Sequence, residues 1–248
     1  MADYQTKMPE KNFKHTLSVI IPVYNEEKTI LKLIDKVKSV KIKGVNKEII
    51  VVDDYSSDGT RDVLKRLKDK SIKSVFHNKN WGKGKALKTG ISSSSGDFII
   101  FQDADFEYEP NDYKNIIKPL INGEADFVLG QRIFPKFFSK NNKVPMHILG
   151  NKIITLVGNT LYSTNLKDYE PCYKAFKSSL LKSINVEAND FNYDLELMAK
   201  LFRKGYKFKI VKISYKPRTR EEGKKIRYKD GLTAILTLIK SRFKSLKN

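Results

Sequence analysis

The first half of the chain alternates short apolar runs with segments in which apolar residues recur every three or four positions. The runs predict buried strands, and the periodic segments predict amphipathic helices. The predicted strands occupy residues 17–22, 48–53, 72–77, 97–102 and 126–130. The predicted helices occupy residues 26–40, 58–70, 86–93 and 111–121. Continuous apolar strands separated by such helices indicate an α/β fold, with a mostly parallel central sheet covered by helices on both faces.

The second half is less regular, but the same signals continue. They predict helices at 146–162, 194–204 and 228–246, and strands at 173–176 and 207–215. No linker or internal repeat divides the sequence, so we expect a single domain over residues 1–248, with a core of about 16–232 and a C-terminal amphipathic helix over 228–246. We expect the apolar stripe of that helix to pack against the sheet. The stripe consists of Leu232, Ile235, Leu236, Ile239, Phe243 and Leu246.

The 248 residues include 48 Lys and Arg against 28 Asp and Glu, a formal net charge of +20. Such a surface favours anionic partners such as nucleic acid, acidic lipid head groups or phosphorylated substrates, although the charge can serve solubility alone. The single cysteine, Cys172, excludes an intrachain disulfide or a cysteine metal cluster and predicts a reducing compartment. Residues 1–14 lack the apolar segment of a signal peptide, and no run approaches the roughly 18–20 apolar residues that span a bilayer. We therefore expect a soluble or peripheral protein.

Two carboxylates follow the predicted strand at 97–102, in the sequence Asp103-Ala104-Asp105. Open α/β sheets bind ligands beyond the carboxyl ends of their strands, so these side chains are placed to act on a substrate. Mg²⁺ and Mn²⁺ prefer oxygen ligands and often take only one or two from the protein, the rest coming from phosphate and water. The pair therefore predicts a divalent cation held against a diphosphate, with a solvated loop as the alternative.

Four sequence blocks at successive predicted strand ends resemble family 2 glycosyltransferases of the GT-A fold. They are SVIIPVYNEE (18–27), VVDDYSSDGT (51–60), NWGKGKA (80–86, followed by Gly90) and the Asp103-Ala104-Asp105 unit. Three further blocks, GQR (130–132), DYEPCYK (168–174) and EGKKI (222–226), extend the likeness toward dolichyl- and undecaprenyl-phosphate sugar transferases. The resemblance covers about residues 16–232. It implies a metal-dependent, inverting enzyme that moves a hexose from a nucleotide sugar, of the GDP-mannose or UDP-glucose type, to a polyprenyl phosphate.

The resemblance places the donor nucleotide at the ends of the first two strands. Pro22 ends the first strand, because its ring cannot continue the ladder. The ring of Tyr24 can then pack on a nucleobase, while Glu26 and Asp54 accept hydrogen bonds from the base or the ribose. Taken alone, Glu26 is an ordinary acidic residue in a first helical turn, and Asp53 can equally be structural.

Around the diphosphate, the resemblance assigns the metal to Asp105 and Glu107. It places Asp103 and Ala104 at the donor, with Asp103 against the ribose or, through water, the metal. The resemblance implies a Gln at the position of Glu107. This chain departs from that pattern, and the Glu would supply a harder, more anionic oxygen ligand. Lys83 lies between two glycines that give the backbone freedom, and can approach a phosphate. A plain turn before a helix is the alternative.

The resemblance places four cations against the sugar diphosphate or the acceptor phosphate: Arg132, Arg218, Lys224 and Lys225. Arginine suits phosphate because its planar fork donates two bonds at once, although most charge runs are solvated loops. Asp168 and Glu170 are candidate general bases for a hydroxyl acceptor. A lipid phosphate is already an anionic nucleophile, and for it they would bind or support instead. No histidine falls in a motif block, and none is assigned a role.

A lipid acceptor requires contact with a membrane, and two segments are candidates. The loop at 133–144, with Phe134, Phe137 and Phe138 among lysines, is the better one, because the final helix is expected to pack. We therefore expect a peripheral enzyme at the cytoplasmic face of a membrane, in cell-envelope glycan synthesis, with or without a separate membrane partner. The alternatives are transfer to a saccharide hydroxyl in a polysaccharide or glycolipid, a catalytically inactive relative, and a basic nucleic-acid-binding protein, for which the sequence has no recognised module.

Overall fold

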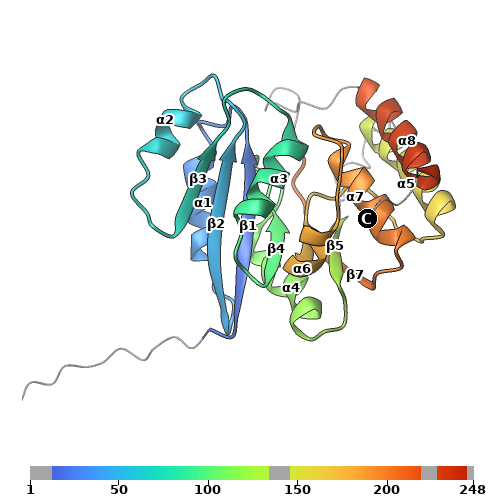
Figure 1. Cartoon of the computed structure of the whole chain (residues 1–248), viewed down its shortest axis with the longest axis horizontal. Coiled ribbons are helices and arrows are strands. Elements are labelled where there is room, and N and C mark those ends of the chain that lie inside the picture. Colours follow the sequence, from blue (N-terminus) through green and yellow to red (C-terminus); the bar gives the residue numbers. More distant parts are fainter. Residues whose placement is uncertain (1–12, 134–145, 219–227, 245–248) are drawn as a thin grey trace, which may run out of the picture.

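The computed structural model describes residues 13–133, 146–218 and 228–244. Its centre is a seven-stranded sheet in the order β3-β2-β1-β4-β6-β5-β7 (Figure 1). The strands are β1 His15–Val23, β2 Val45–Asp53, β3 Ile72–Phe76, β4 Phe98–Phe101, β5 Phe127–Ile133, β6 Lys174–Lys177 and β7 Phe208–Ser214. Neighbouring strands are parallel except where β6 pairs with β4 and β5, to both of which it is antiparallel. The predicted mostly parallel sheet is confirmed.

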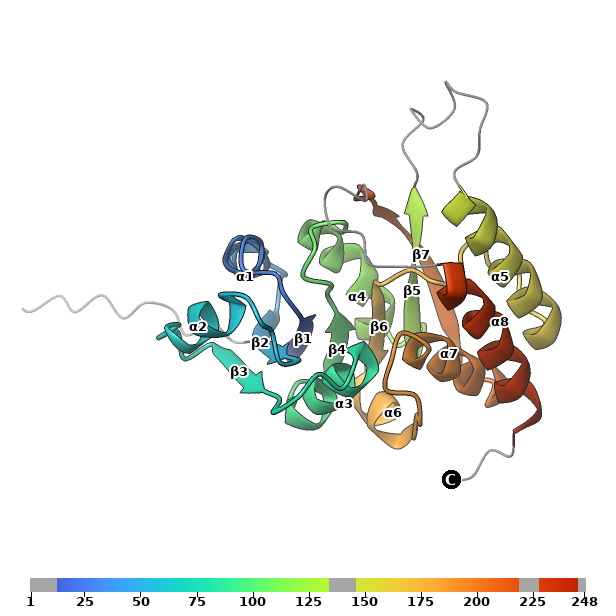
Figure 2. The same ribbon diagram turned by 90° about the horizontal axis from the view of Figure 1, so that it is seen from above.

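Helices cover both faces of this sheet. They are α1 Ile30–Ser39, α2 Thr60–Lys65, α3 Lys83–Ser93, α4 Tyr113–Ile121, α5 Met146–Tyr162, α6 Ser178–Ser183, α7 Tyr193–Arg203 and α8 Tyr228–Phe243, with a 3₁₀ turn η1 at Pro110–Asp112. Figure 2 shows α1 and α4 on one face and α3 and α6 on the other, with α5 and α8 side by side at the end of the molecule beyond α7. The predicted α/β class with helices on both faces is therefore confirmed.

Some element boundaries differ from the prediction. α1 begins at Ile30 rather than at residue 26, because the N–H groups of Thr29 and Ile30 both donate to the Glu26 carbonyl and form a turn first. α2 ends at Lys65, and the chain re-enters the sheet through Asp69, whose carboxylate accepts a hydrogen bond from the N–H of Ser71 at 2.8 Å. The short helix α6 and the antiparallel direction of β6 were not predicted.

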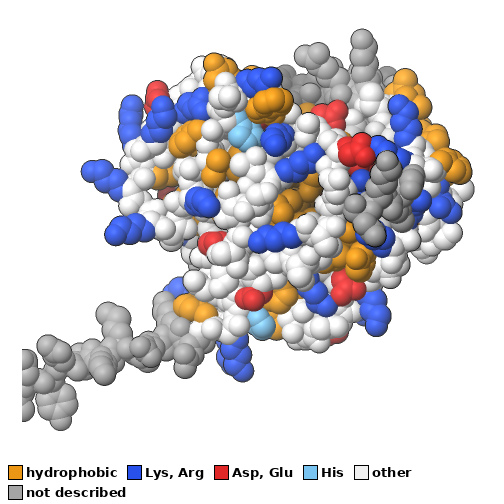
Figure 3. Space-filling model, in the orientation of Figure 1, with side chains coloured by type: hydrophobic (Ala, Val, Ile, Leu, Met, Phe, Trp, Pro, Cys, Tyr) orange, Lys and Arg blue, Asp and Glu red, His pale blue; other side chains and the backbone are white. Residues whose placement is uncertain are grey.

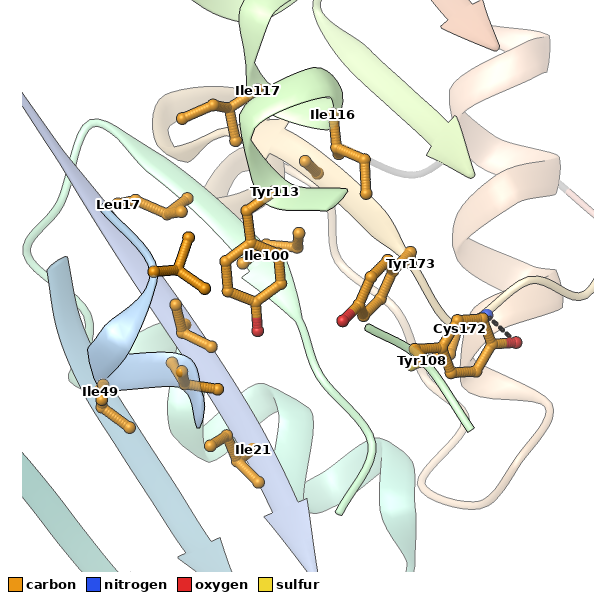
Figure 4. Packing of buried hydrophobic residues seen from close by; sticks show 14 of the residues in the cluster. Leu17, Ile21, Ile49, Ile100, Tyr108, Tyr113, Ile116, Ile117, Cys172 and Tyr173 are labelled. Atoms are coloured by element: carbon orange, nitrogen blue, oxygen red, sulfur yellow. Dashed lines mark hydrogen bonds between the residues drawn. The ribbon is translucent and has the colours of Figure 1, made fainter. Parts of the chain in front are cut away.

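The core between the sheet and helices α1 and α4 contains tyrosines as well as aliphatic side chains (Figure 4). The rings of Tyr113 and Tyr173 lie 5.6 Å apart, and both hydroxyls donate to Oε1 of buried Gln102 at 2.6 Å. These bonds satisfy the buried polar atoms. They also fix the end of β4, because Gln102 directly precedes the Asp103-Ala104-Asp105 motif.

Strand register brings the sequence motifs to one edge of the sheet. β1, β2 and β4 are parallel, with Val23 opposite Asp53, so their carboxyl ends open together. β6 runs the other way, and therefore its N-terminal end, preceded by residues 168–173, lies at the same edge. β5 and β7 also end there, with Ile133 opposite Ser214. This convergence is what an open α/β sheet provides for a ligand site.

Helix α8 packs differently from the prediction. It lies against α5 and α7 and buries Ala234 and Leu238. The expectation that its predicted apolar stripe packs on the sheet is wrong for the members that are exposed, which are Leu232, Leu236, Ile239 and Phe243. Ile235 is half-buried, and Leu246 lies outside the described residues. No helix within the described ranges is long and apolar enough to cross a bilayer.

Candidate active site

The loop between β3 and α3 is held by a buried carboxylate at the end of β2. Asp54 is 3% exposed, and it accepts hydrogen bonds from the N–H groups of Trp81 at 3.0 Å and Gly82 at 2.7 Å. Nδ1 of His77 lies 2.7 Å from the same carboxylate, and Nε2 lies 2.9 Å from the Thr89 hydroxyl. Both Asp54 oxygens are thus engaged within the protein. The sequence analysis assigned His77 no role, although His77 directly follows β3, which pairs with β2, the strand that ends at Asp53.

Lys83 opens α3 beside a glycine that the packing requires. A Cβ on Gly82, whose φ is 94°, would lie 2.6 Å from the carbonyl oxygen of Asn189. The Lys83 ammonium lies 2.7 Å from Asp103 and 3.9 Å from Asp194. Burial alone would lower the pKa of Lys83, but these carboxylates raise it well above its usual range. The site therefore holds a permanent positive charge next to the motif.

The two carboxylates of the motif have opposite electrostatic surroundings. Burial would raise the pKa of Asp103, but the charge of Lys83 outweighs it and the pKa is lowered. For Asp105, burial and the negative charges of Asp103 and Glu107 raise the pKa to about 7. Its Oδ1 accepts a hydrogen bond from the N–H of Glu107 at 3.1 Å. This excess of negative charge would favour a divalent cation beside Asp105.

Arg218 joins the ends of β1, β4 and β7. Its guanidinium donates to the two oxygens of Glu26 at 3.2 Å each, and its Nε donates to the carbonyl of Asp105 at 2.6 Å. The backbone N–H of Arg218 donates to one carboxylate oxygen of Glu107 at 2.7 Å. The other oxygen accepts from the Tyr215 hydroxyl at 3.0 Å. Glu107 thereby fixes the segment after β7 against the loop that carries Asp105.

The carboxylate oxygens of Asp105 and Glu107 suit a small divalent cation whose remaining ligands come from a diphosphate and water. Within the described ranges, no group of three His, Cys, Asp or Glu side chains could hold a metal by itself. Mg²⁺ commonly uses one or two carboxylates and completes its shell with phosphate and water. Asp105 fits as the principal ligand. Glu107 would bind through the lone pairs that Arg218 and Tyr215 leave free.

A cleft of about 560 Å³ opens among these groups, a volume typical of small-ligand sites. Of the predicted donor residues, Glu26, Asp105 and Arg218 line it. Tyr24 is exposed just beyond β1, and Pro22 lies one residue before the end of that strand. The described residues that line the cleft are Asn25, Glu26, Glu27, Lys28, Thr29, Asp58, Asp105, Phe106, Lys216, Pro217 and Arg218.

Arg132, at the end of β5, forms a two-point contact with Asp168. Its nitrogens donate to the two carboxylate oxygens at 2.5 and 2.7 Å, and its guanidinium lies 5.0 Å from the centre of the Tyr215 ring. Asn151 of α5 donates to the same carboxylate at 3.0 Å. Burial would raise the pKa of Asp168, but the hydrogen bond and charge of Arg132 lower it. Asp168 is therefore suited to positioning Arg132 and poorly suited to accepting a proton.

Glu170 has different surroundings. Burial raises its pKa, although the positive charges of Arg132 and Lys174 oppose that shift. Its carboxylate accepts no hydrogen bond from any residue that the structure describes. Of the two predicted general bases, Glu170 is therefore the one whose carboxylate has no hydrogen-bond donor in the described part of the chain.

A chain of buried charges lies behind the motif, and the sequence did not single it out. Lys174 is 1% exposed, and it donates to Asp194 at 3.0 Å and to the carbonyl of Pro171. Asp194, in the first turn of α7, faces both Lys174 and Lys83, so opposite charges alternate from Asp103 to Lys174. The sequence feature that could have indicated this chain of charges is Lys174, a lysine within the short strand predicted at 173–176.

Other predicted residues contribute no side chain to the described site. Ala104 is buried in the hydrophobic core. Lys224 and Lys225 lie outside the described residues, as do Phe134, Phe137 and Phe138 of the basic loop.

Residues 18–184 match the sequence model of the family described as Glycosyl transferase family 2. The chain is 29% identical over 218 residues to the UDP-N-acetylglucosamine–dolichyl-phosphate N-acetylglucosaminyltransferase of Methanococcus voltae, covering 80% of this chain and 84% of that protein. It is 27% identical over 206 residues to the dolichol-phosphate mannosyltransferase of Pyrococcus furiosus, covering 80% of this chain and 55% of that protein, so it spans about half of that relative's length.

Among solved structures, the glucosyl-3-phosphoglycerate synthase of Mycobacterium tuberculosis, in complex with Mn²⁺, UDP and phosphoglyceric acid, has a similar fold. The TM-score is 0.71 at 21% sequence identity, over 93% of this chain and 79% of that one. At this identity the likeness concerns the fold.

Proposed function

Because the chain belongs to glycosyl transferase family 2 and has the GT-A fold, we propose that it transfers a hexose from a nucleotide-diphosphate sugar to a polyprenyl phosphate. The names of the two relatives, which both refer to dolichyl phosphate, support this acceptor class. Their sugars differ, so the donor stays between the GDP-mannose and UDP-glucose types. One observation carries the proposal: Glu26, Asp105 and Arg218 meet at a single cleft. The cleft thus brings together a hydrogen-bond acceptor for the nucleoside (Glu26), a cation ligand (Asp105) and a guanidinium that can bind phosphate (Arg218).

The donor nucleotide occupies the ends of β1 and β4 in this proposal. The exposed ring of Tyr24 packs on the base, and Glu26 accepts hydrogen bonds from the base or the ribose. Arg218 reaches both Glu26 and the backbone of Asp105, so a diphosphate at Asp105 lies beside its guanidinium. Asp54 acts through the loop that it holds, and is a positioning residue.

The leaving diphosphate is stabilised by positive charge. Asp105 and Glu107 would hold Mg²⁺ or Mn²⁺, which when bound supplies Lewis-acid stabilisation of the departing nucleotide diphosphate. Lys83 and Arg218 add fixed charges near the same point, and Lys224 and Lys225 are proposed to do the same. Such preorganised charge lowers the barrier because it needs no reorientation as the bond breaks.

The acceptor phosphate lies at Arg132 in this scheme. One phosphate oxygen attacks the anomeric carbon from the side opposite the diphosphate, and the new C–O bond forms as the bond to the diphosphate breaks. The configuration inverts, and no proton has to be removed because the phosphate is already an anion. Asp168 holds the Arg132 guanidinium in place for this step.

The state of Glu170 favours a second candidate, which is transfer to a saccharide hydroxyl. A half-buried carboxylate with a raised pKa and no hydrogen-bond donor among the described residues resembles a general base more than a structural support. Glu170→Gln distinguishes the two reactions. With a hydroxyl acceptor the rate should fall by about a hundredfold or more, and with a phosphate acceptor by less than about tenfold.

A polyprenyl acceptor would place the protein at a membrane. We propose that it works as a peripheral protein on the cytoplasmic face, in cell-envelope glycan synthesis, where a nucleotide sugar and a lipid phosphate can meet. A separate membrane protein could assist it. Nucleic acid is not a partner in this proposal, because the basic groups described at the site are arranged around a cleft for a small ligand.

A panel of radiolabelled UDP- and GDP-sugars tests the proposal. The protein is incubated with each donor, Mg²⁺ or Mn²⁺, and a short polyprenyl phosphate in detergent. We expect an acid-labile labelled lipid from one donor, abolished by EDTA. Labelled saccharide without labelled lipid would favour the second candidate, and no turnover of any donor would contradict both.

A further inference from the structure

Two helices present the same apolar pattern on their outer sides. The buried residues of these helices, such as Ile154 on α5 and Leu238 on α8, lie on the opposite, inner sides. The outer apolar residues are therefore not part of the described core. The exposure of the outer residues reaches 67% for Leu156 and 78% for Phe243. The outer residues, at i, i+4 and i+7 spacing, are Leu149, Ile153 and Leu156 on α5, and Leu232, Leu236, Ile239 and Phe243 on α8. We call these seven residues the α5–α8 face.

The two stripes belong to one surface. α5 and α8 pack against each other, and both pack on α7. Figures 1 and 2 show them side by side at one end of the molecule, and apolar side chains gather along that edge in Figure 3. A soluble protein seldom exposes so many large apolar side chains on adjacent helices unless the surface binds something.

The surroundings of the face are basic. Lys152 on α5 and Lys240 and Arg242 on α8 are exposed, and the helical period places Lys240 and Arg242 on either side of the α8 stripe. The sequence of α5 contains no acidic residue, and that of α8 contains only Asp230. Apolar helix faces flanked by basic residues are typical of helices that lie in the interface of an anionic bilayer.

We propose that the α5–α8 face docks on a bilayer that contains anionic lipid. The inference rests on the proposed function, in which the acceptor is a membrane lipid. A second copy of the chain fits less well, because in a symmetric dimer through this face the basic flanks would oppose one another.

Helix α5 connects the face to the site. Its Asn151 donates to Asp168, the partner of Arg132, and its Thr155 hydroxyl accepts from the N–H of Tyr169 at 3.2 Å. Docking through α5 would therefore hold the acceptor end of the site close to the lipid head groups. The basic loop predicted as a membrane segment precedes α5 in the sequence and lies outside the described residues, apart from Ile133.

Vesicle sedimentation of the full chain tests the docking, without donor or polyprenyl phosphate. We expect the protein to bind vesicles of phosphatidylcholine with phosphatidylglycerol, and to bind pure phosphatidylcholine more weakly. The double variant Leu156→Glu, Leu236→Glu should bind the anionic vesicles at least about tenfold more weakly. Leu31→Glu is the matched control, because Leu31 is a 41% exposed leucine on α1, away from the face. It should bind like the wild type.

Several outcomes would overturn the docking. They are a wild type that stays in the supernatant with anionic vesicles, and a double variant that sediments like the Leu31→Glu control at an unchanged melting temperature. A dimer in light scattering that the double variant dissociates, without vesicle binding, would assign the face to a second copy instead.

Transfer to a water-soluble short prenyl phosphate separates this inference from the proposed function. Transfer without vesicle binding would contradict the docking alone, and vesicle binding without any transfer would contradict the proposed function alone. We expect the double variant to retain transfer to the soluble acceptor.

Discussion

The carboxylates at the end of β4 show how neighbouring residues divide the work of a site. Asp103 is paired with Lys83, whereas Asp105 faces other carboxylates and has a pKa raised to about 7. The first interaction is an ion pair within the protein, and the second is an excess of negative charge that would favour the proposed cation. A sequence contains the two aspartates, but it does not say which one is neutralised by the protein.

This difference predicts opposite effects of two similar substitutions. Asp103→Asn leaves the largely buried Lys83 without its close partner, so the free energy of unfolding should fall by about 3 kcal/mol. Asp105→Asn removes a charge that the fold disfavours, so the metal-free protein should be no less stable, while transfer falls by about a hundredfold or more. Urea unfolding and the transfer assay measure the two effects. A destabilised Asp105→Asn variant would contradict this assignment.

The pair between Arg132 and Asp168 predicts a pH dependence. The pKa of Asp168 is lower in the folded than in the unfolded protein. The ion pair therefore makes its full contribution to the free energy of unfolding above the unfolded carboxyl pKa of about 3.9, and this contribution is lost as the pH falls through the folded pKa. Asp168→Asn should therefore lower the free energy of unfolding at pH 7 by about 3 kcal/mol, and by less as the pH falls below about 4. Urea unfolding of both proteins at each pH measures the difference. A gap that stays constant down to pH 3 would argue against the ion pair.

Sequence alone does not show which distant residues a side chain will contact in the folded protein. Asp54 was predicted to meet the nucleotide, but its oxygens accept from the loop at Trp81 and Gly82 and contact His77. The family resemblance assigned Glu107 to the metal, and in the structure its carboxylate also accepts hydrogen bonds from Tyr215 and Arg218, more than 100 residues away. Motif spacing identifies candidate residues, but only the folded structure shows which of their polar atoms are already hydrogen-bonded within the protein.

At the scale of elements, continuous apolar runs located the strands of the first half well, because a buried parallel strand is apolar on both faces. β6 is short and pairs with β4 and β5 from distant parts of the sequence, so nothing local gives its direction. The outward apolar stripe of α8 misled the prediction for a related reason. Periodicity shows that a helix has an apolar side, but not whether that side meets the protein.

The contact between α3 and β1 gives a prediction about packing. A Cβ on Gly90 would lie 2.4 Å from Cγ2 of buried Ile20, whereas a Cβ on Gly150 of α5 would meet nothing within 4 Å. Gly90→Ala should therefore lower the free energy of unfolding by about 1–3 kcal/mol. Gly150→Ala, the matched control in another helix, should raise it by about 0.5–1 kcal/mol. Equal effects of the two substitutions, measured by urea unfolding, would contradict the close approach of α3 to β1.

At the scale of the whole molecule, the sheet topology explains why distant blocks form one site. Parallel strands bring the ends of β1, β2 and β4 together, and the reversed β6 adds residues 168–173 from the other half of the chain. The family resemblance anticipated this architecture because its blocks fall at successive strand ends. It could not give the exposed α5–α8 face, which arises from how three helices stack.

The central claim is that the sugar goes to a lipid phosphate, and the most direct test compares two acceptors that differ only in that group. A polyprenyl phosphate and the corresponding polyprenol are offered with the active donor and Mg²⁺ or Mn²⁺, and lipid labelling is measured. We predict labelling of the phosphate, none of the alcohol, and no labelling of either by Asp105→Asn. Equal labelling of both lipids, or labelling of the alcohol alone, would contradict the account.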